Sequence, residues 1–462
     1  MSIGLTMRYT TRHLLRELPL ASARCERLQR DERMDPDERR PASERMLRRT
    51  LQRAVDVLPA YEVFRGRIPR DGLQEFLQEL PIISKTQLIG ERERYYPNGG
   101  RPRPWWSIGR TSGSTATPLE VFRSFDSTLW EQAVFLQHWN WAGWRAGERQ
   151  AVLRGDLVVP LERNEPPFWF DDRAGRQLIV STRHLNARNV RAIAAALADY
   201  QPTLMRAYPS AAHSLAVLMR EQSLEMPIRA VVTSSEGLLP MQRETIESVF
   251  SARVFDHYGM AERVAFGMQC EAGRVHVHPS YSHVEIVDEH GRATKGPGHV
   301  VGTTYHNLAM PLLRYRVDDL AQWGEGPCPC GRTYPWLQSL QGRASDLLYD
   351  AEGQPVTAGV VTFAFKGVPH VARAQVVQRE PARWHVRVVP LPGYSATTEA
   401  QLLSNFRRLV SQRVEVCLTL EDDIPVQPSG KYKWISQEYY PLYSRAASSV
   451  SESEAETPAY RA

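Results

Sequence analysis

The stretch Ala230-Val231-Val232-Thr233 and the two segments that follow it, residues 240–250 and 252–255, decide the fold. Ala230 to Thr233 is a short run of apolar and β-branched residues, which is typical of a buried strand. Residues 240–250 have a helical pattern, and residues 252–255 form a second strand-like run. A strand, a helix and another strand in this order predict that the two strands lie parallel in one sheet.

The same alternation extends along the chain in both directions. Strand-like runs occur at residues 151–153 and 284–287, and another helical pattern covers residues 190–200. The sequence from about residue 102 to residue 340 therefore predicts an α/β architecture with mostly parallel sheets. We assign residues 67–341 to this large domain.

The N-terminal 66 residues have a different pattern. They are rich in Arg and carry an apolar stripe at three- and four-residue spacing, to which Leu47, Leu51, Ala54 and Leu58 belong. Such a stripe is typical of a helix with one buried face. Residues 1–66 are therefore predicted to form a helical segment that docks on the large domain.

The C-terminal part changes character after residue 341. Short strand-like runs at residues 374–377, 384–389 and 414–420 surround one helical pattern at residues 399–414. This arrangement predicts a small, mobile α+β domain over residues 342–443. Residues 444–462 are rich in Ser, Glu and Ala and are predicted to be a disordered tail.

Composition excludes several classes of protein. The 462 residues are 42% hydrophobic and 24% charged, which is ordinary for a globular chain, and they are too many for one core. The net charge of +5 comes from Arg residues interleaved with Asp and Glu, a pattern that argues against nucleic-acid binding. The absence of a long apolar run argues against membrane insertion and predicts a cytoplasmic protein.

The most informative motif is Thr111-Ser112-Gly113-Ser114-Thr115-Ala116-Thr117-Pro118. Hydroxyl groups and a glycine in a short span offer many donors to a polyphosphate, although an ordinary turn has the same composition. The segment is not the GxxxxGK[ST] phosphate loop, because no Lys follows in register.

Four further motifs gain meaning when they are taken in order. They are Asp256-His257-Tyr258-Gly259-Met260-Ala261-Glu262, Arg314-Tyr315-Arg316-Val317-Asp318-Asp319, Gly342-Arg343-Ala344-Ser345-Asp346 and Pro428-Ser429-Gly430-Lys431-Tyr432-Lys433. In isolation each has a plainer interpretation, namely a strand-end turn, a surface salt bridge or a solvated lysine. Together with the Ser/Thr/Gly loop they resemble the adenylate-forming superfamily over roughly residues 45–440.

Within that superfamily the chain looks most like the phenylacetate–CoA ligase family, in its capsular-polysaccharide-type branch. The supporting segments are Leu58-Pro59-Ala60-Tyr61, Leu80-Pro81-Ile82-Ile83-Ser84-Lys85 and Cys328-Pro329-Cys330-Gly331-Arg332. The resemblance implies a carboxylate that attacks the α-phosphorus of ATP to give an acyl-adenylate and pyrophosphate, followed by transfer to a thiol. Coenzyme A is the expected acyl acceptor, while an amine or a carrier protein stays open as the acceptor. A homodimer is also left open. A non-catalytic relative that serves as a binding protein is the alternative.

The resemblance also assigns residues. Cofactor binding falls to Thr111, Ser112, Gly113, Ser114 and Thr115 for the triphosphate, Glu236, Tyr258 and Gly259 for adenine, and Asp319 for ribose. Catalysis falls to Glu262 as the Mg²⁺ ligand, Arg343 at the hinge and Lys431 beside the reacting oxygens. Ala116, Ala261 and Ser345 depart from the family pattern, and none of them removes an assigned group.

A sulfur-rich set suggests a metal site. Cys270, His276, Cys328 and Cys330 supply three thiolates and one imidazole, which is a ligand set for structural Zn²⁺. Reduced thiols without metal are the alternative, and His278 is an alternative ligand.

The acyl pocket is the least specific inference. The fold of the resembled family would place Trp139, Tyr208 and Phe266 near the acid, although core packing explains such aromatics equally well. An aryl acid is therefore a hypothesis.

Overall fold

The computed structural model describes residues 19–111, 119–154, 156, 158–341, 348–351, 355–356, 361, 364–365, 367–380, 382–409, 414–426 and 432–438. These residues fall into two compact units: one holds the described residues up to Gln341, and the other holds those from Leu348 onward. Among these residues, no helix combines the length and the apolar character that crossing a bilayer requires. The predicted tail at 444–462 lies outside the described residues.

The first unit contains both helices and strands. Its helices are α2 (Pro19–Asp31), α3 (Pro36–Val57), η1 (Pro59–Phe64), α4 (Leu73–Gln78), α5 (Lys85–Gly90), α6 (Arg92–Tyr95), η2 (Pro97–Gly100), α7 (Phe125–Trp141), η3 (Thr182–His184), α8 (Val190–Tyr200), α9 (Pro209–Glu221) and α10 (Pro240–Phe250). Its strands are β1 (Ser107–Arg110), β2 (Glu120–Arg123), β3 (Gln150–Leu153), β4 (Trp169–Asp172), β5 (Gln177–Val180), β6 (Leu204–Ala207), β7 (Ala230–Ser234), β8 (Arg253–Gly259), β9 (Phe266–Gln269), β10 (Val275–Val277), β11 (Ser282–Val287), β12 (Gly298–Thr304), β13 (Tyr315–Trp323) and β14 (Trp336–Gln341).

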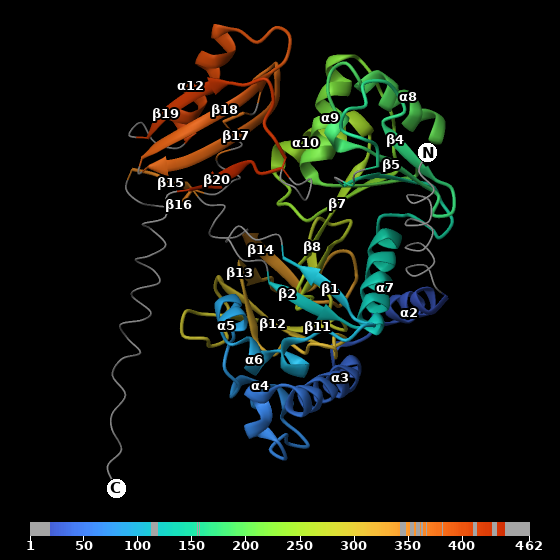
Figure 1. The fold of residues 1–462 in the computed structure, drawn as a ribbon, viewed down its shortest axis with the longest axis vertical. Helices are drawn as coiled ribbons and strands as arrows, with labels where there is room; N and C mark the ends of the chain where they lie inside the picture. The colour runs from blue at the N-terminus through green and yellow to red at the C-terminus, as the bar shows by residue number, and fades with distance from the viewer. Residues whose placement is uncertain are drawn as a thin grey trace. The chain divides into compact units, whose positions relative to one another are not determined.

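Twelve of the described strands form one sheet, in the order β11-β12-β13-β14-β10-β9-β8-β7-β6-β3-β5-β4 (Figure 1). The neighbours β5, β3, β6, β7 and β8 run parallel. Antiparallel strands extend this parallel part on both sides, beginning with β4 and β9. All five residues of β7 are buried, as expected for a strand of a parallel sheet covered on both faces. The α/β prediction is confirmed.

The crossover helices begin and end where local chemistry places them. Pro240 opens α10 with a backbone torsion already suited to a helix and no N–H to satisfy. Gln201 and Ser251 end α8 and α10 in the left-handed conformation, which stops helical hydrogen bonding. The predicted bounds of both helices are therefore confirmed.

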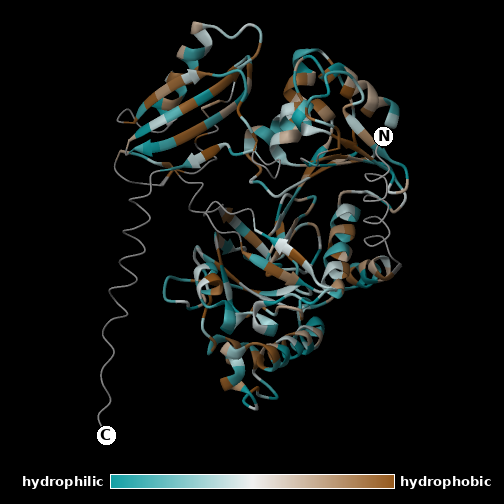
Figure 2. Cartoon of the chain, in the orientation of Figure 1, coloured by the Kyte–Doolittle hydropathy of each residue, from teal (hydrophilic) through white to brown (hydrophobic). Residues whose placement is uncertain are grey.

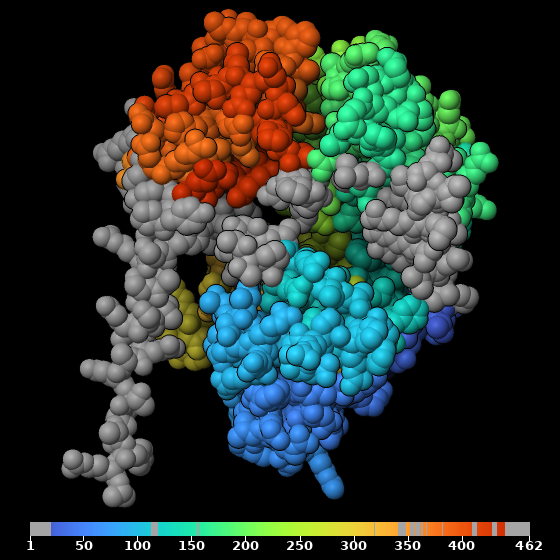
Figure 3. Space-filling model, in the orientation of Figure 1, coloured from blue at the N-terminus to red at the C-terminus, as the bar shows by residue number. Residues whose placement is uncertain are grey.

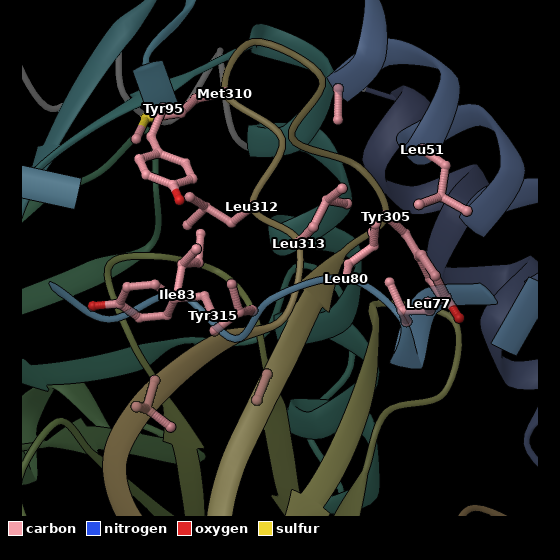
Figure 4. Packing of buried hydrophobic residues seen from close by; sticks show 14 of the residues in the cluster. Leu51, Leu77, Leu80, Ile83, Tyr95, Tyr305, Met310, Leu312, Leu313 and Tyr315 are labelled. Atoms are coloured by element: carbon pink, nitrogen blue, oxygen red, sulfur yellow. The ribbon is translucent and has the colours of Figure 1, made fainter. Parts of the chain in front are cut away.

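The N-terminal helices pack into the core of the first unit. Leu47, Leu51 and Ala54 of α3 are buried in a cluster that also contains Tyr305 and Leu313. Figure 4 shows Leu51, Tyr305 and Leu313 gathered with side chains from the segment before α5. Burying one Leu side chain stabilises a fold by about 2 kcal/mol, so this stripe holds α3 firmly.

The segment between α4 and α5 joins the far end of the sheet through its backbone. Ile83 donates its N–H to the Arg314 carbonyl at 3.1 Å and accepts the Arg316 N–H at 2.9 Å. The buried Arg314 guanidinium is paired with Glu285 at 3.1 Å and also donates to the Leu80 carbonyl. These bonds fix the start of β13, where Tyr315 lies. Figure 3 shows the blue and cyan segments, from α3 to α7, as one continuous surface.

The second unit is smaller. Its elements are β15 (Leu348–Tyr349), β16 (Pro355–Val356), β17 (Val371–Glu380), β18 (Arg383–Pro390), α12 (Ala396–Leu409), β19 (Glu415–Leu420) and β20 (Ile435–Gln437). A four-stranded sheet has the order β19-β18-β17-β20. Along β18, buried Trp384, Val386 and Val388 alternate with less buried residues. Figure 2 shows hydrophilic and hydrophobic bands along the strands of this sheet. The helix predicted at residues 399–414 begins at Ala396 instead and, within the described residues, ends at Leu409.

Candidate active site

Strands β1 and β2 form a hairpin around the predicted phosphate loop. Ser112, Gly113, Ser114 and Thr115 lie outside the described residues, whereas Thr111 is described and buried. The Thr111 N–H donates to the Leu119 carbonyl at 3.1 Å, and the Leu119 N–H donates to the Thr111 hydroxyl oxygen at 3.0 Å. These two bonds close the neck of the loop, and the hydroxyl still has a proton to donate.

Arg123 links this hairpin to the turn that carries Glu262. Its guanidinium donates to the carbonyl of Ala261, the residue directly before Glu262. The same guanidinium covers Gly109 of the facing strand, so a Cβ at Gly109 would displace the guanidinium. Burial lowers the pKa of Arg123, and neighbouring Arg263 lowers it further. Arg123 thus fixes the position of the hairpin relative to the turn that carries Glu262.

Glu262 is buried, and a tyrosine hydroxyl donates a hydrogen bond to its carboxylate. The hydroxyl of Tyr315, which is itself 2% exposed, donates to Oε1 of Glu262 at 3.0 Å. Next to it, Arg263 is ion-paired with Glu131 and donates to the Ser127 hydroxyl at 2.8 Å. A carboxylate in this position presents oxygen atoms, the ligands that Mg²⁺ prefers.

Tyr258 and Asp319 meet although they come from distant strands. The Tyr258 hydroxyl donates to Oδ2 of Asp319 at 2.7 Å. Strands β8 and β13 have β9, β10 and β14 between them in the sheet order, so a flat sheet would separate them by about 19 Å. The contact therefore requires a curved sheet that brings these strands together. Gly259 follows Tyr258, and a Cβ there would lie 3.1 Å from the His257 ring.

Glu236 lies in the segment after β7. Its Oε2 accepts the Ser210 N–H at 3.1 Å, near the start of α9, where a negative charge is favoured by the helix dipole. Ser235, the residue before it, has a positive φ of 72°. The structure thus gives Glu236 a helix-capping contact, and its predicted contact with adenine stays a prediction.

The aromatic residues proposed for the acyl pocket separate into two groups. Trp139 and Phe266 belong to a hydrophobic core cluster, where Phe266 stacks on His257 at 4.7 Å. Tyr208 follows β6 instead and lies beneath Arg154, whose guanidinium carbon is 5.4 Å from the ring centroid. Core packing therefore accounts for Trp139 and Phe266.

The predicted metal ligands come together. The ligand atoms of Cys270, His276, Cys328 and Cys330 all lie within 4.8 Å of one another. The sulfur atoms of Cys270 and Cys328 are 3.7 Å apart, and Cys330 Sγ is 3.4 Å from His276 Nε2. A tetrahedral Zn²⁺ with 2.3 Å bonds to sulfur would place two sulfur atoms about 3.8 Å apart. The donor set and its spacing fit such an ion.

The surroundings orient the His276 ring and tune the thiols. His276 Nδ1 is 2.9 Å from the Tyr334 carbonyl, which leaves Nε2 facing the cysteines, an arrangement common among metal-binding histidines. Burial raises the pKa of Cys270 to about 12. Burial also acts to raise the pKa of Cys330, but hydrogen bonds from Arg332 and Cys328 lower it overall. His278 lies outside the cluster and is 3.0 Å from the Gln137 side-chain oxygen.

Some predicted site residues lie outside the described part of the chain, and some residues at the site had no predicted role. Lys431 and Arg343 lie outside the described residues, so their roles stay predictions. The sequence assigns no role to Tyr315, although Tyr315 lies in one of the motifs, and the motifs do not include Arg123 or Arg154. Arg154 directly follows a predicted strand, and the rule that ligands bind at the carboxyl ends of parallel strands is a signal for it.

The chain is similar to several known proteins. Residues 348–438 match the family model described as the CapK C-terminal domain. Protein CapK of Staphylococcus aureus is 24% identical over 276 residues, which are 58% of this chain and 60% of CapK. The phenylacetate-coenzyme A ligase of Thermus thermophilus is 29% identical over 160 residues, 32% of this chain and 36% of that enzyme. The match thus spans less than two thirds of either protein.

A longer alignment and a solved structure extend the comparison. The phenylacetate-coenzyme A ligase of Pseudomonas putida is 25% identical over 323 residues, 65% of this chain and 70% of that enzyme. The crystal structure of 2-hydroxyisobutyryl-CoA ligase with 2-HIB-AMP, in the postadenylation state, has a TM-score of 0.68 at 19% identity. It covers 92% of this chain and 94% of that one. At this identity the likeness shows the fold.

Proposed function

Because the chain belongs to the phenylacetate–CoA ligase-like, CapK-type family, we propose that it activates a carboxylic acid with ATP and Mg²⁺. A carboxylate oxygen attacks the α-phosphorus, the bond to the β-phosphate bridging oxygen breaks, and acyl-AMP and pyrophosphate form. A thiolate then attacks the acyl carbonyl and AMP leaves. Coenzyme A is the proposed thiol, and 2-hydroxyisobutyryl-CoA ligase, which shares the fold, was solved with an acyl-AMP and CoA.

The observation that carries this proposal is the 2.7 Å bond from Tyr258 to Asp319. The residues expected to contact adenine and ribose are 61 positions apart, yet the sheet brings them together. A carboxylate has several acceptor positions, so holding the Tyr258 hydroxyl is compatible with accepting ribose hydroxyls. Glu262, anchored by Tyr315, supplies the proposed Mg²⁺ ligand.

The remaining parts of the proposal concern the two domains. Residues 111–115 cradle the triphosphate, Arg343 contacts ribose or phosphate at the hinge, and Lys431 neutralises oxygens in the transition state. Adenylation is mostly positioning and electrostatic stabilisation, so such groups are sufficient for it. The domain division at residues 67–341 and 342–443 belongs to the proposal.

The Cys/His cluster is proposed to hold structural Zn²⁺. Four protein ligands complete a tetrahedron and leave no open position for substrate, so the ion stabilises the fold and performs no chemistry. Metal analysis of the purified protein tests this, with one equivalent of zinc expected.

The decisive experiment is acid-dependent exchange of labelled pyrophosphate into ATP, with AMP release measured with and without CoA. We expect exchange with some acids and faster AMP release with CoA. Lys431→Ala is expected to abolish exchange, while Lys433→Ala, two positions away, serves as the matched control. A protein that binds ATP but exchanges pyrophosphate with no acid is the non-catalytic alternative. Release driven by an amine or a carrier protein instead of CoA would identify another acceptor.

A further inference from the structure

The carboxyl edge of the parallel strands carries a cation that the proposed adenylation does not use. Arg154 follows β3, Tyr208 follows β6, and Ser235 follows β7. Because β3, β6, β7 and β8 run parallel, these residues lie at the same edge of the sheet as Tyr258. In open α/β sheets this edge is where ligands bind.

Arg154 is held there by neutral groups. Its Nη2 donates to the Ser235 hydroxyl at 2.9 Å, and its guanidinium lies over the Tyr208 ring at 5.4 Å. It also hydrogen-bonds the Tyr208 side chain, which opposes the rise that burial causes in the Tyr208 pKa. A guanidinium has five N–H donors in a planar fork, so these contacts leave donors for a ligand.

Among the described residues, three of the four fully buried arginines are paired with carboxylates, whereas the fourth, Arg39, donates to carbonyl oxygens and a hydroxyl. Arg263 pairs with Glu131, Arg314 with Glu285, and Arg332 with Glu271. Within the described part of the chain, no ion pair includes Arg154. Arg154 is half-buried, so its charge is less hydrated than that of a surface arginine.

The two acidic residues near Arg154 do not form an ion pair with it. Glu236 and Asp156 act electrostatically on Tyr208, beside Arg154. The Glu236 carboxylate, however, accepts the Ser210 N–H at the start of α9, and neither acid forms an ion pair with Arg154. An incoming carboxylate would form two parallel, charge-assisted hydrogen bonds with the guanidinium fork.

We propose that Arg154 recognises a second, non-reacting carboxylate on the acid, so that the substrate class is a dicarboxylic acid. This inference rests on the proposed adenylation. One carboxylate attacks ATP, while the other stays ionised against Arg154 and undergoes no reaction. Arg154 is thus a specificity-determining residue, and Tyr208 and Ser235 position its guanidinium.

Matched acids test this with the full chain. Pyrophosphate exchange is measured with glutarate against pentanoate and with isophthalate against benzoate. We expect the wild type to favour the dicarboxylate of each pair in kcat/KM. Arg154→Met is expected to lower kcat/KM for dicarboxylates by roughly 10- to 100-fold and to leave the monocarboxylates unchanged. Arg154→Lys keeps the charge without the fork and is expected to recover part of the loss.

The control lies at the other end of the same strand. Arg149 directly precedes β3, is exposed, and lies 5.7 Å from the ring centroid of Tyr200, which mirrors the Arg154 contact with Tyr208. Arg149→Met is expected to leave the preference for dicarboxylates intact. Equal thermal unfolding temperatures for Arg154→Met and the wild type show that the fold is kept.

The outcomes distinguish a failure of the Arg154 proposal from a failure of the proposed adenylation. A wild type with no preference for dicarboxylates, or an Arg154→Met protein that loses activity equally on both members of each pair, overturns the role of Arg154 and leaves adenylation standing. Equal loss would place Arg154 at the reacting carboxylate. If ATP binds with Mg²⁺, as measured by calorimetry, and no acid supports exchange, adenylation itself fails and the inference fails with it.

Discussion

The nucleotide-side residues and the Cys/His cluster lie on, or in loops that join, strands of one sheet but differ in what holds their side chains. Tyr258 and Tyr315 donate hydrogen bonds to Asp319 and Glu262, so those two carboxylates are already oriented by the chain itself. In the Cys/His cluster the sulfur and ring nitrogen atoms contact one another, and thiols are weak hydrogen-bond donors. The first region is therefore oriented by the chain alone, whereas the second, under the proposal of a structural Zn²⁺, would depend on that ion for its stability.

The largest expected effect comes from removing the proposed Mg²⁺ ligand. Glu262→Gln keeps the shape and can still accept the Tyr315 hydrogen bond, but it removes the negative charge that would hold the metal. We expect pyrophosphate exchange to fall roughly 100- to 1,000-fold, a typical cost for losing one electrostatic group of a transition state. Exchange kinetics at saturating Mg²⁺ measure this.

The control for Glu262→Gln is Glu225→Gln. Glu225 is exposed and precedes β7, so it lies toward the amino end of the strand whose carboxyl end carries Ser235. The Glu225→Gln protein should exchange pyrophosphate at the rate of the wild type. Similar losses in both variants, or a lower unfolding temperature for Glu262→Gln alone, would argue that Glu262 is structural.

The next largest effect is expected from losing the metal. Cys328→Ser removes one of four ligands and should release the zinc and lower the free energy of unfolding by about 4 kcal/mol, the linkage expected for an ion present at about 1,000 times its dissociation constant. Metal content and thermal unfolding with and without a chelator measure it.

Cys25→Ser is the matched control for this variant. Cys25 is also a buried thiol but is absent from the cluster, and the Asn140 amide contacts its sulfur at 3.6 Å. The contrast between the two regions fails if chelation lowers the unfolding temperature of neither the wild type nor Cys25→Ser.

Asp256 lies on β8, the strand that ends at Tyr258, and its N–H donates to Gln269, the neighbour of Cys270. Burial raises its pKa from 3.8 to about 7, although the Thr233 hydroxyl opposes the shift. The folded state therefore binds this proton more tightly than the unfolded state. Its contribution to stability is full below pH 3.8 and is lost as the pH rises to about 7.

Asp256→Asn removes the titration. Between pH 4 and pH 7 the wild type should lose up to about 1.4 kcal/mol of stability per pH unit from this group, and the variant should show a flatter profile. Denaturant unfolding at several pH values measures the difference. Parallel profiles for the two proteins would contradict a raised pKa for Asp256.

Local signals predicted the parts of the fold that depend on neighbours in sequence. The bounds of α8 and α10 follow from their helical pattern and from stop positions at Gln201 and Ser251. The helix expected at residues 399–414 begins three residues earlier, because the small side chains of Ala396, Thr397 and Thr398 add no strong apolar signal. The antiparallel strands around β9 to β14 depend on strand pairing, which periodicity does not encode.

The candidate site shows the same limit. The spacing of Cys270, His276, Cys328 and Cys330 predicted a group that the structure brings together. The bond between Tyr258 and Asp319 depends on how the sheet curves across three intervening strands, and no local pattern records that. The contacts of Arg154 with Tyr208 and Ser235 depend on the strand order, so the sequence alone gives no sign of them.

The smallest effects should come from the two tyrosine hydroxyls, which distinguish the anchors within the nucleotide region. Tyr315→Phe leaves an oxygen of the buried Glu262 without its donor, so exchange should fall about 10-fold with a higher Mg²⁺ requirement, because hydrogen bonds to charged groups contribute about 1.5–3 kcal/mol. Tyr258→Phe removes the bond to Asp319 at a less buried position but keeps the ring, so we expect about a 3-fold rise in KM for ATP, toward the low end of hydrogen-bond contributions. Mg²⁺ titrations and ATP saturation curves separate the two. A Tyr258→Phe protein that changes Mg²⁺ dependence, or a Tyr315→Phe protein that changes only KM for ATP, would reverse the assignment of metal to Glu262 and nucleoside to Asp319.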